Sequence, residues 1–277
     1  MNKKQTFDLN DPETISAIDE LPLWSAPFGL TLLETVKIRR NINILDIGSG
    51  LGFPLLELAG RFVDSCKLFG IDPWDAARER AIQKAKLYGL NNVTLIKAVA
   101  EEMPFEDDYF DLIMSNNGLN NVEDLEKSLS ECRRTAKTGC QLVFTMNLPG
   151  SMSLFYEYFE KTLRHFGLDV RVDALQEHIF QKRKPVDFMI ETVKKYNFEP
   201  VEIKENSFSL RFSDGTTLFN HFLIRIGFLP AWKKITPEEY SEKVFTELEN
   251  SLNQYAELNG EISLNIPYAC FDCLCTK

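Results

Sequence analysis

The chain has 277 residues, of which 44% are hydrophobic, so it can bury a large core as one elaborated domain or two small ones. Its formal net charge of −10 argues against nucleic acid as a partner, because a negative surface repels phosphate backbones. No apolar run reaches the roughly 18–20 residues that cross a bilayer, and the first residues, MNKKQTFDLNDPE, lack the apolar block of a signal peptide. We therefore expect a cytoplasmic protein without a membrane partner.

In chain order, residues 1–41 come first, and this segment, which contains IDELPLWSAPFG, is expected to be an N-terminal helical cap. From 42 to 147, strand-like apolar runs alternate with helical patterns. The predicted strands are INILDIG, KLFGID, VTLIKA, FDLIMSN and CQLVFTMN, and the predicted helices are LLELAGRF, DAARERAIQKAKLYG and VEDLEKSLSECRRTA. Such alternation is typical of a parallel sheet covered by helices on both faces.

Residues 148–184, beginning LPGSMSLFYEYFEKTLRHFG, break the alternation, and we expect them to form a lid insertion. Residues 185–277 add two strands, within PVEIKENSFSLRF and EISLNIPYACFDCLC, each after a helix. The predicted fold class is therefore α/β: a doubly wound, mostly parallel seven-stranded sheet with helical lid insertions, in a single domain over 1–277. Ligands of such sheets bind beyond the carboxyl ends of the strands, which both inserted segments can reach.

The stretch ILDIGSGLGFP, residues 44–54, places an acid and three glycines directly after a predicted buried strand. A strand-to-helix turn that brings the backbone close to a ligand needs residues without Cβ, and Gly48, Gly50 and Gly52 meet that need. A dinucleotide-binding loop would have its third glycine at position 53, where this chain has Phe53, so the loop lacks the seat for a pyrophosphate. The GK[ST] sequence of a nucleoside-triphosphate-binding loop is also missing.

A second acid, Asp72, ends the next predicted strand in LFGID. An acid at that position can accept both hydroxyls of a ribose. Asp46 points instead to a ligand with a cationic group over the loop. S-adenosylmethionine has a ribose, an ammonium and a sulfonium, and no phosphate, so it suits both acids.

On these motifs, residues 44–147 resemble the class I S-adenosylmethionine-dependent methyltransferases, in particular the small-molecule group similar to the quinone-biosynthesis and type-11 enzymes. The resemblance is carried by LDIGSGLG (45–52), GID (70–72), AEEMPFEDDYFDLIMSN (100–116) and LVFTMN (142–147). It implies a Rossmann-like methyltransferase fold with 42–147 as the cofactor-binding core. It also implies these cofactor-binding residues: Asp46, Gly48, Ser49, Gly50, Asp72, Pro73, Trp74, Ala100, Glu101, Asn116 and Asn117.

Within that set, the resemblance gives Asp46, Gly48 and Gly50 the methionine end of S-adenosylmethionine and Asp72 the ribose. Pro73 and Trp74 would lie near the adenine face. Members of the family often have an aspartate, in Gly-Asp-Ala, that receives the adenine amino group, but this chain has Val99 there. The amino contact must then come from Glu101, from backbone or from water. Asn116 and Asn117 would stand near the transferable methyl group.

Each of these assignments has a structural alternative. Asp72 can merely cap the following helix, Trp74 can be ordinary packing, and Asn116 and Asn117 can be turn residues that bond their own backbone. The aromatic residues of LFYEYFEKTLRHF can form a helix stripe packed on a core, or line a site for a planar acceptor. For the acceptor we select Trp24, Tyr156 and His221 as candidate substrate-binding residues.

Methyl transfer needs a general base only when the acceptor is protonated. Three histidines are candidates, His165, His178 and His221, and the sequence favours none, so the catalytic residue stays unknown. CFDCLC contains C-x-x-C without a second ligand pair, and its alternation indicates buried residues of a strand, so we predict no metal site. Six scattered cysteines fit a reducing compartment.

The predicted function is S-adenosylmethionine-dependent transfer of a methyl group to a small-molecule acceptor by in-line displacement. The alternative is a non-catalytic S-adenosylmethionine-binding or regulatory protein of the same fold, which Val99 and the lack of an evident base support. Protein or nucleic-acid methylation is disfavoured, because SNNG stands where an NPPY-type signature would follow the fourth strand. The oligomeric state is left open.

Overall fold

The computed structural model describes residues 7–20, 23–62 and 65–277. They divide into two compact units. The sheet unit comprises Asp8–Asn147, Lys184–Asn206 and Tyr268–Lys277, and the helical unit comprises Leu148–Arg183, Ser207–Pro267 and, at the chain start, Phe7. Strands β6 (Phe198–Phe212) and β7 (Ile262–Cys275) contribute residues to both units.

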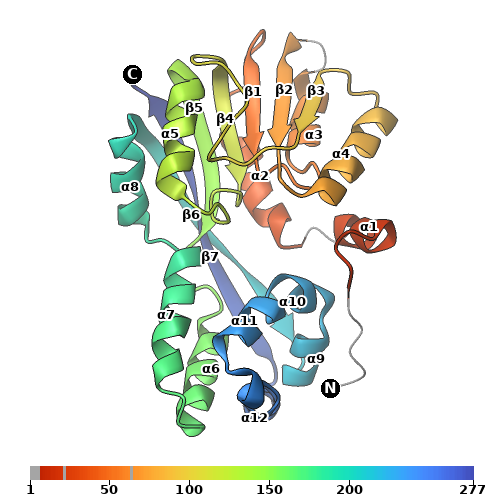
Figure 1. Cartoon of the computed structure of the whole chain (residues 1–277), viewed down its shortest axis with the longest axis vertical. Helices are drawn as coiled ribbons and strands as arrows, with labels where there is room; N and C mark the ends of the chain where they lie inside the picture. The colour runs from red at the N-terminus through yellow and green to blue at the C-terminus, as the bar shows by residue number, and fades with distance from the viewer. Residues whose placement is uncertain (1–6, 21–22, 63–64) are drawn as a thin grey trace. The chain divides into compact units, whose positions relative to one another are not determined.

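Seven strands form one sheet in the order β3-β2-β1-β4-β5-β7-β6, and the first five are easily followed in Figure 1. The other strands are β1 (Asn43–Ile47), β2 (Lys67–Ile71), β3 (Val93–Ile96), β4 (Phe110–Asn116) and β5 (Ala136–Asn147). Strands β3, β2, β1, β4 and β5 run parallel to one another, whereas β7 runs antiparallel to β5. The predicted doubly wound, mostly parallel seven-stranded sheet is confirmed.

Several helices of the sheet unit pack on these strands. The helices of this unit are α1 (Pro12–Glu20), α2 (Ser25–Thr35), α3 (Leu55–Phe62), α4 (Asp75–Leu87), α5 (Leu125–Thr135) and α8 (Val186–Lys195). Helix α2 packs on β4 and β5, α3 on β2, and α4 on β3, whereas α1 packs on α4. Strand β1 shows no alternation of buried and exposed residues. Its last four residues are all buried, because both faces of a parallel sheet are covered.

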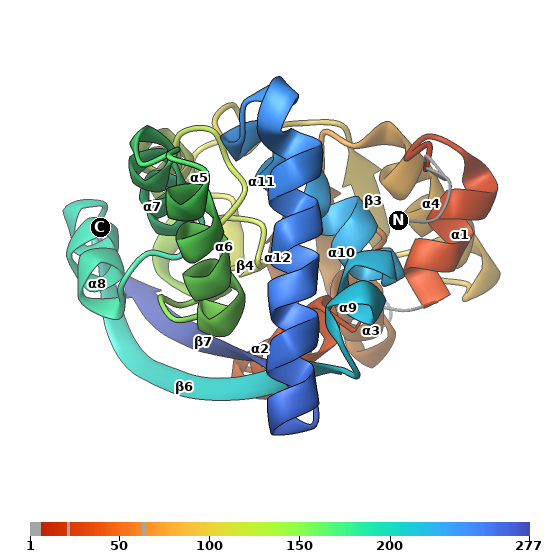
Figure 2. The ribbon, with the colours of Figure 1, turned by 90° about the horizontal axis from the view of Figure 1, so that it is seen from below.

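The helical unit contains α6 (Ser153–His165), α7 (Val170–Lys182), α9 (Gly215–Asn220), α10 (Phe222–Gly227), α11 (Leu229–Ile235) and α12 (Glu238–Asn259). Figure 2 shows the long helix α12 with α6 along one side and α9 along the other, and these are its main contacts. Phe155, Phe159 and Trp232 are fully buried in this unit. The aromatic stripe of α6 is therefore packed, as the structural alternative predicted.

The predicted helices and strands of 42–147 and 185–277 are present with small shifts at their ends. The expected N-terminal cap contains α1 and α2, although Leu21 and Pro22 of its IDELPLWSAPFG motif lie outside the described residues. The expected lid segment 148–184 contains α6 and α7, and its role as a lid stays a prediction. Within the described ranges, none of the helices is long and apolar enough to cross a membrane.

Candidate cofactor site

The glycine loop follows β1 at the carboxyl edge of the sheet. The N–H groups of Gly48 and Ser49 both donate to the carbonyl of Ile71 on β2, at 2.9 and 3.1 Å. Gly48 and Gly50 have positive φ values of 73° and 48°, a region that residues with a Cβ avoid. The loop therefore turns sharply over the end of β2, which the glycine spacing predicted.

Asp72 lies at the end of β2 and is 8% exposed. Its Oδ2 accepts a hydrogen bond from the N–H of Gly50, at 2.8 Å, and its Oδ1 accepts one from the N–H of Trp74, also at 2.8 Å. The second bond closes a turn before α4, whose N-cap is Trp74 without a side-chain cap bond, so the helix-cap alternative for Asp72 is wrong. The bond to Gly50 also ties Asp72 to the glycine loop.

Asp46, on β1, is fully buried, and neither of its carboxylate oxygens has a hydrogen-bond partner among the described residues. Burial raises the pKa of this carboxyl well above its ordinary value, and the negative charge of Asp72 raises that pKa further. A buried carboxylate without a partner is costly, since it has lost its water. Asp46 is therefore suited to a cationic ligand, which would offset this cost.

Two buried hydrogen-bond donors without partners among the described residues accompany the Asp46 carboxylate. Neither the hydroxyl of Ser49 nor the side-chain Nδ2 of Asn117 has a hydrogen-bond partner within the part of the chain that the structure describes. Asn117 has a positive φ of 60° after β4, and its Oδ1 accepts from Asn120 at 3.1 Å. Strand β1 thus contributes one unpaired buried carboxylate, and the loops after β1 and β4 contribute two unpaired buried donor groups.

These two loops approach each other closely. A Cβ on Gly48 would lie 2.8 Å from the Cα of Gly118, and a Cβ on Gly118 would lie 2.2 Å from the carbonyl oxygen of Ile47. The Ser115 hydroxyl donates to the same carbonyl at 2.9 Å. The sequence analysis did not select Ser115 or Gly118, although the glycine in SNNG was a signal for close backbone approach.

Asn116 has a different environment from its neighbour. Its Oδ1 accepts from the Thr145 hydroxyl at 2.9 Å, and its Nδ2 donates to the carbonyl of Ser25 at 3.1 Å. The side chain therefore links β4 to β5 and to the start of α2. Its predicted place near the transferable methyl group stays a prediction.

The predicted adenine side shows no direct replacement for the missing aspartate. Val99 is 43% exposed, and Ala100 is buried. The Oε1 of Glu101 accepts from the N–H groups of Glu123 and Asp124, at 2.7 and 3.0 Å. Glu101 thus anchors the segment before α5 with one oxygen and retains Oε2 for another donor.

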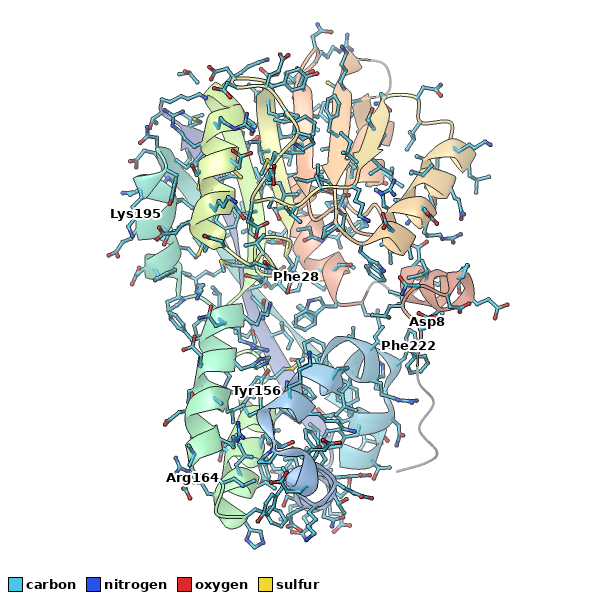
Figure 3. All side chains as sticks on the ribbon, viewed as in Figure 1. Asp8, Phe28, Tyr156, Arg164, Lys195 and Phe222 are labelled. Atoms are coloured by element: carbon cyan, nitrogen blue, oxygen red, sulfur yellow. The ribbon has the colours of Figure 1, made fainter. Side chains whose placement is uncertain are left out.

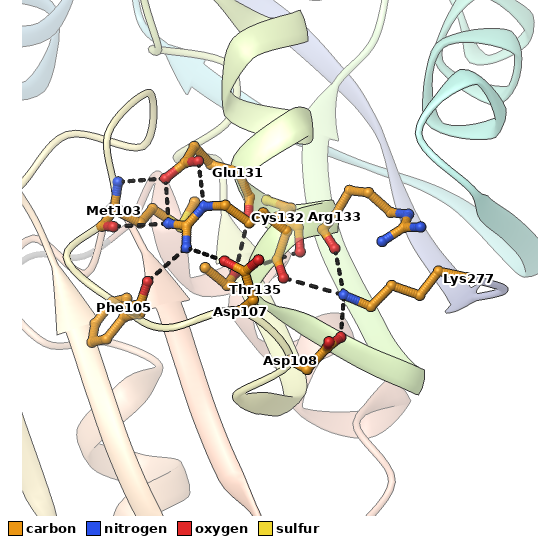
Figure 4. A network of polar contacts seen from close by, with 10 residues as sticks. Met103, Phe105, Asp107, Asp108, Glu131, Cys132, Arg133, Thr135 and Lys277 are labelled. Carbon is orange, nitrogen blue, oxygen red and sulfur yellow. Dashed lines mark hydrogen bonds and ion pairs between the residues drawn. The ribbon is translucent and has the colours of Figure 1, made fainter.

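Arg134 holds this loop in place, and its partners Met103, Phe105, Asp107 and Glu131 are labelled in Figure 4. The guanidinium of Arg134, on α5, donates to the carbonyls of Met103 and Phe105 at 3.0 and 2.7 Å. It also forms ion pairs with Glu131 and Asp107, at 2.7 and 2.9 Å. Glu131 in turn accepts from the N–H of Met103 at 2.8 Å. The loop that carries Ala100 and Glu101 is therefore fixed to α5.

Trp74 and Pro73 stand just after Asp72. Pro73 is exposed, and the Trp74 ring is half-buried, with its Nε1 donating to the carbonyl of Leu9 at 3.0 Å. Trp74 therefore packs against the start of the sheet unit. Both residues flank the Asp72 end of the site.

The three candidate acceptor residues are distributed over the two units. Trp24 belongs to the sheet unit, where its ring lies 5.6 Å from that of Phe28, which is labelled in Figure 3. Tyr156 and His221 belong to the helical unit. His221 packs on Phe212, and its Nδ1 is buried with no partner in the described ranges.

The other two histidines lie in very different surroundings. His165 is exposed at the end of α6, whereas His178 on α7 is half-buried. Burial and the positive charges of Arg183 and Lys182 lower the pKa of His178 to about 4, so its imidazole is neutral at physiological pH. The geometry selects none of the three histidines as a general base.

All six cysteines are free and buried. Cys270, Cys273 and Cys275 of the CFDCLC stretch lie on β7 and fill the sheet, as the alternation predicted. Burial raises the pKa of the Cys270 thiol to about 11 and that of the Cys273 thiol further still. Among the described residues, no group of three His, Cys, Asp or Glu side chains is placed to hold a metal ion.

The sheet order with its antiparallel seventh strand is that of the Rossmann-like methyltransferase fold, and the glycine loop with its two acids lies where the resemblance to class I S-adenosylmethionine-dependent methyltransferases implied. Residues 45–144 match the family Methyltransf_11, described as "Methyltransferase domain". Residues 45–144 form a methyltransferase domain, and the protein uses S-adenosylmethionine as methyl donor and acts on a small molecule.

Two relatives illustrate the match. The chain is 27% identical over 188 residues to demethylmenaquinone methyltransferase of Geobacillus stearothermophilus, a match that covers 65% of this chain and 80% of the relative. It is 33% identical over 112 residues to the ubiquinone/menaquinone biosynthesis C-methyltransferase UbiE of Proteus mirabilis, which covers 40% of this chain and 45% of the relative. The comparisons favour the enzyme over the non-catalytic alternative.

Solved structures share the fold at lower identity. The YcgJ protein of Bacillus subtilis superimposes with a TM-score of 0.57 at 18% identity, covering 91% of this chain and 99% of that one. Phosphoethanolamine N-methyltransferase 2 of Haemonchus contortus superimposes with a TM-score of 0.58 at 17% identity, covering 99% of this chain and 61% of that one.

Proposed function

We propose that the sheet unit binds S-adenosylmethionine through Asp46, Ser49, Gly50, Asp72 and Asn117. The observation that carries this proposal is the set of unpaired buried groups at the ends of β1 and β4: one carboxylate, on Asp46 within β1, and two donors, on Ser49 and Asn117 in the loops that follow the strands. An α-amino acid group carries an ammonium and a carboxylate, so it is complementary to one acceptor and two donors. The methionine end of the cofactor has this group.

Asp72 suits the ribose. Each of its carboxylate oxygens already accepts one backbone N–H, and a carboxylate oxygen has a second acceptor site. Two ribose hydroxyls can therefore donate to Asp72 without displacing Gly50 or Trp74. Glu101 Oε2 and nearby backbone are proposed to face the adenine end, because Val99 has no acceptor.

When bound, the cofactor supplies an electrophilic methyl group on its sulfonium. The residues of this chain bind, orient and desolvate it. Asp46 contributes a negative charge to the cationic end, and the glycine turn lets backbone approach the ligand. Positioning and exclusion of water can then provide much of the acceleration of an in-line displacement.

For the acceptor we propose a planar, ring-containing small molecule. Two relatives carry the names of quinone-pathway methyltransferases, whose acceptors contain such a ring. The family match covers residues 45–144, which form the cofactor core, so the proposal extends to the class of acceptor and not to demethylmenaquinone itself. We also propose that the enzyme works in the cytoplasm, where its six buried thiols stay reduced.

Calorimetric titration with S-adenosylmethionine and S-adenosylhomocysteine tests the cofactor site. We expect saturable one-site binding to the wild type and its loss in Asp72→Ala and Gly50→Val, since a β-branched residue is strained at the positive φ of Gly50. Gly60→Ala is the matched control, because Gly60 lies on α3 with open space around it. Absence of binding to folded wild-type protein would refute the proposal.

The acceptor class is tested next, with labelled methyl transfer to a panel of quinols, phenols and non-aromatic alcohols and amines. We expect turnover with ring-containing acceptors. Turnover confined to the non-aromatic compounds would contradict the acceptor class and leave the cofactor site intact.

A further inference from the structure

Arg183 is an unusual residue of the helical unit. It caps the C-terminus of α7 and is only 2% exposed, whereas arginine is almost never fully buried unless it is paired. No acidic side chain forms an ion pair with it in the described ranges. A cation in this position has lost its water without gaining a counter-ion.

The contacts of Arg183 are few. Its Nη2 donates to the hydroxyl of Tyr156 at 2.9 Å, and the guanidinium lies over the Tyr156 ring, 4.9 Å from its centroid. Its Nε and Nη1 have no hydrogen-bond partner among the described residues. These two nitrogens carry three N–H groups, so most of the donors of this side chain are unused.

Tyr156 adds a fourth donor. It lies on α6 and is labelled in Figure 3; its hydroxyl oxygen accepts from Arg183 and from the Nε1 of Trp232, the latter at 3.1 Å. A hydroxyl has two acceptor sites and one proton, so both acceptor sites are taken and the proton remains to be donated. The structure gives no acceptor for that proton among the described residues.

Two titratable side chains lie near this cluster. His178 lies 6.5 Å from Tyr156, ring to ring, and Lys182 precedes Arg183 on α7. The positive charge of Arg183 lowers the pKa values of both His178 and Lys182, after the larger effect of burial. His178 is neutral at physiological pH, but the repulsion between Arg183 and Lys182 is relieved if a negative charge binds beside Arg183.

We propose that Arg183 and Tyr156 form a binding site for the oxyanion of a small molecule, a carboxylate or phosphate group, with Trp232 holding Tyr156 in position. Four donors without acceptors, gathered on one buried cation and one hydroxyl, are what such a group requires. The neighbouring rings of Phe155 and Trp232 are stacked 3.9 Å apart and fully buried, so they form an apolar support behind these donors.

Direct binding tests this site with the full-length protein. The probes are benzoate, phenyl phosphate and the neutral isostere benzamide, followed by calorimetry and by the shift in Tm. We expect at least one of the two anions to bind, to raise Tm and to bind more weakly as salt rises, whereas benzamide does not bind. Failure of both anions to bind folded wild-type protein, or equal binding of benzamide, overturns the proposal.

Variants locate the site. Arg183→Met keeps an apolar stem and is expected to weaken anion binding at least about tenfold, as is typical for loss of a charged hydrogen bond. Arg171→Met is the matched control, because Arg171 is an exposed arginine of the same helix. If Arg183→Met does not fold, Arg183→Lys and Tyr156→Phe replace it, with a smaller loss expected. Unchanged anion affinity in the folded variants overturns the assignment.

The anion belongs either to the methyl acceptor or to a separate ligand, and labelled methyl transfer distinguishes these sources. Methylation of anionic aromatics that falls in Arg183→Met, with neutral acceptors unaffected, identifies the acceptor. Anions that bind without being methylated identify a separate ligand. S-adenosylmethionine titration of Arg183→Met is expected to match the wild type, because the proposed cofactor residues lie in the sheet unit. Absence of cofactor binding to the wild type would count against the proposed function alone.

Discussion

Asp46 and Asp72 are two buried carboxylates on neighbouring strands, and only one of them is hydrogen-bonded. Asp72 is held by the N–H groups of Gly50 and Trp74, whereas Asp46 has no partner in the described part of the chain. Their mutual repulsion raises the pKa of Asp46 beyond the effect of burial. This pair is more stable with a cation nearby than without one.

The first prediction concerns Asp46→Asn, which keeps the shape of the side chain and removes its charge. The folded-state pKa of Asp46 is raised, so at neutral pH its ionisation destabilises the ligand-free protein. We expect the variant to be more stable by about 1–3 kcal/mol at pH 7.5 and to bind S-adenosylmethionine at least about tenfold more weakly. Thermal unfolding and calorimetry measure the two effects.

The difference in stability between Asp46→Asn and the wild type should depend on pH in a defined way. Below the unfolded pKa, about 3.9, Asp46 is protonated in both states and the stability gap closes. As pH rises from there through the folded pKa, the gap grows in favour of Asp46→Asn. Asp75→Asn is the control, since Asp75 is partly exposed and ion-paired with Arg78 and has a lowered pKa. A lower Tm for Asp46→Asn at neutral pH would contradict the interpretation of Asp46 as unpaired.

The second prediction concerns the affinity for S-adenosylmethionine as pH falls. A cationic ligand favours ionised Asp46, so protonation of this carboxyl opposes binding. We expect affinity to decline as pH falls through the raised pKa of Asp46, and binding in that range to release a proton. Calorimetry in two buffers of different ionisation enthalpy counts the proton. Asp46→Asn should show a shallower profile, in which the remaining slope comes from Asp72, whose pKa burial also raises. An unchanged slope in that variant would assign the whole effect to another group.

The third prediction compares two glycines. Gly48 has a φ of 73°, and a Cβ there would lie 2.8 Å from Gly118, so Gly48→Ala should cost about 1–3 kcal/mol of stability and weaken cofactor binding. Gly60 lies within α3 with free space around it, so Gly60→Ala should be neutral or stabilise the protein by about 0.5–1 kcal/mol. Chemical denaturation measures both; equal effects would contradict the close approach of the two loops.

The fourth prediction concerns Arg134, which joins the loop of Ala100 and Glu101 to α5. We expect Arg134→Met to lower stability by about 1–3 kcal/mol, because two carbonyls and two carboxylates lose their donor at a partly exposed site. Arg133→Met removes the same charge from the next position and serves as control. Hydrogen exchange should show faster opening of residues 97–109 in Arg134→Met alone.

The loss of stability in Arg134→Met should also depend on pH. Arg134 is the main cause of the lowered pKa of Glu131, so the pair stabilises the fold above the unfolded pKa of a glutamate, about 4.3. That contribution is lost as pH falls through the lowered folded pKa. The stability gap between wild type and Arg134→Met should therefore narrow in acid, and a gap that persists at pH 2 would show that the carbonyl bonds dominate.

Local sequence patterns were sufficient to predict the strands and the glycine turn of the sheet unit. The run ILDI, buried at every residue of β1 that it covers, could only be a strand covered on both faces, and glycines at every second position could only be a close turn. The position of Asp72 directly after the second strand was predicted from the same kind of local pattern. These features are determined by neighbours in the chain, so the sequence by itself determined the fold class and the place of the cofactor loop.

The tertiary structure alone decided which polar groups are paired. The sequence treated Asn116 and Asn117 alike, yet Asn116 is bonded to Ser25 and Thr145, while the Nδ2 of Asn117 has no described partner. Arg183 stands in the run KRK, which indicates a solvated surface, and only the packing of α6 and α11 buries it against Tyr156. Hydrogen bonding and desolvation depend on distant segments, so local sequence carries no record of them.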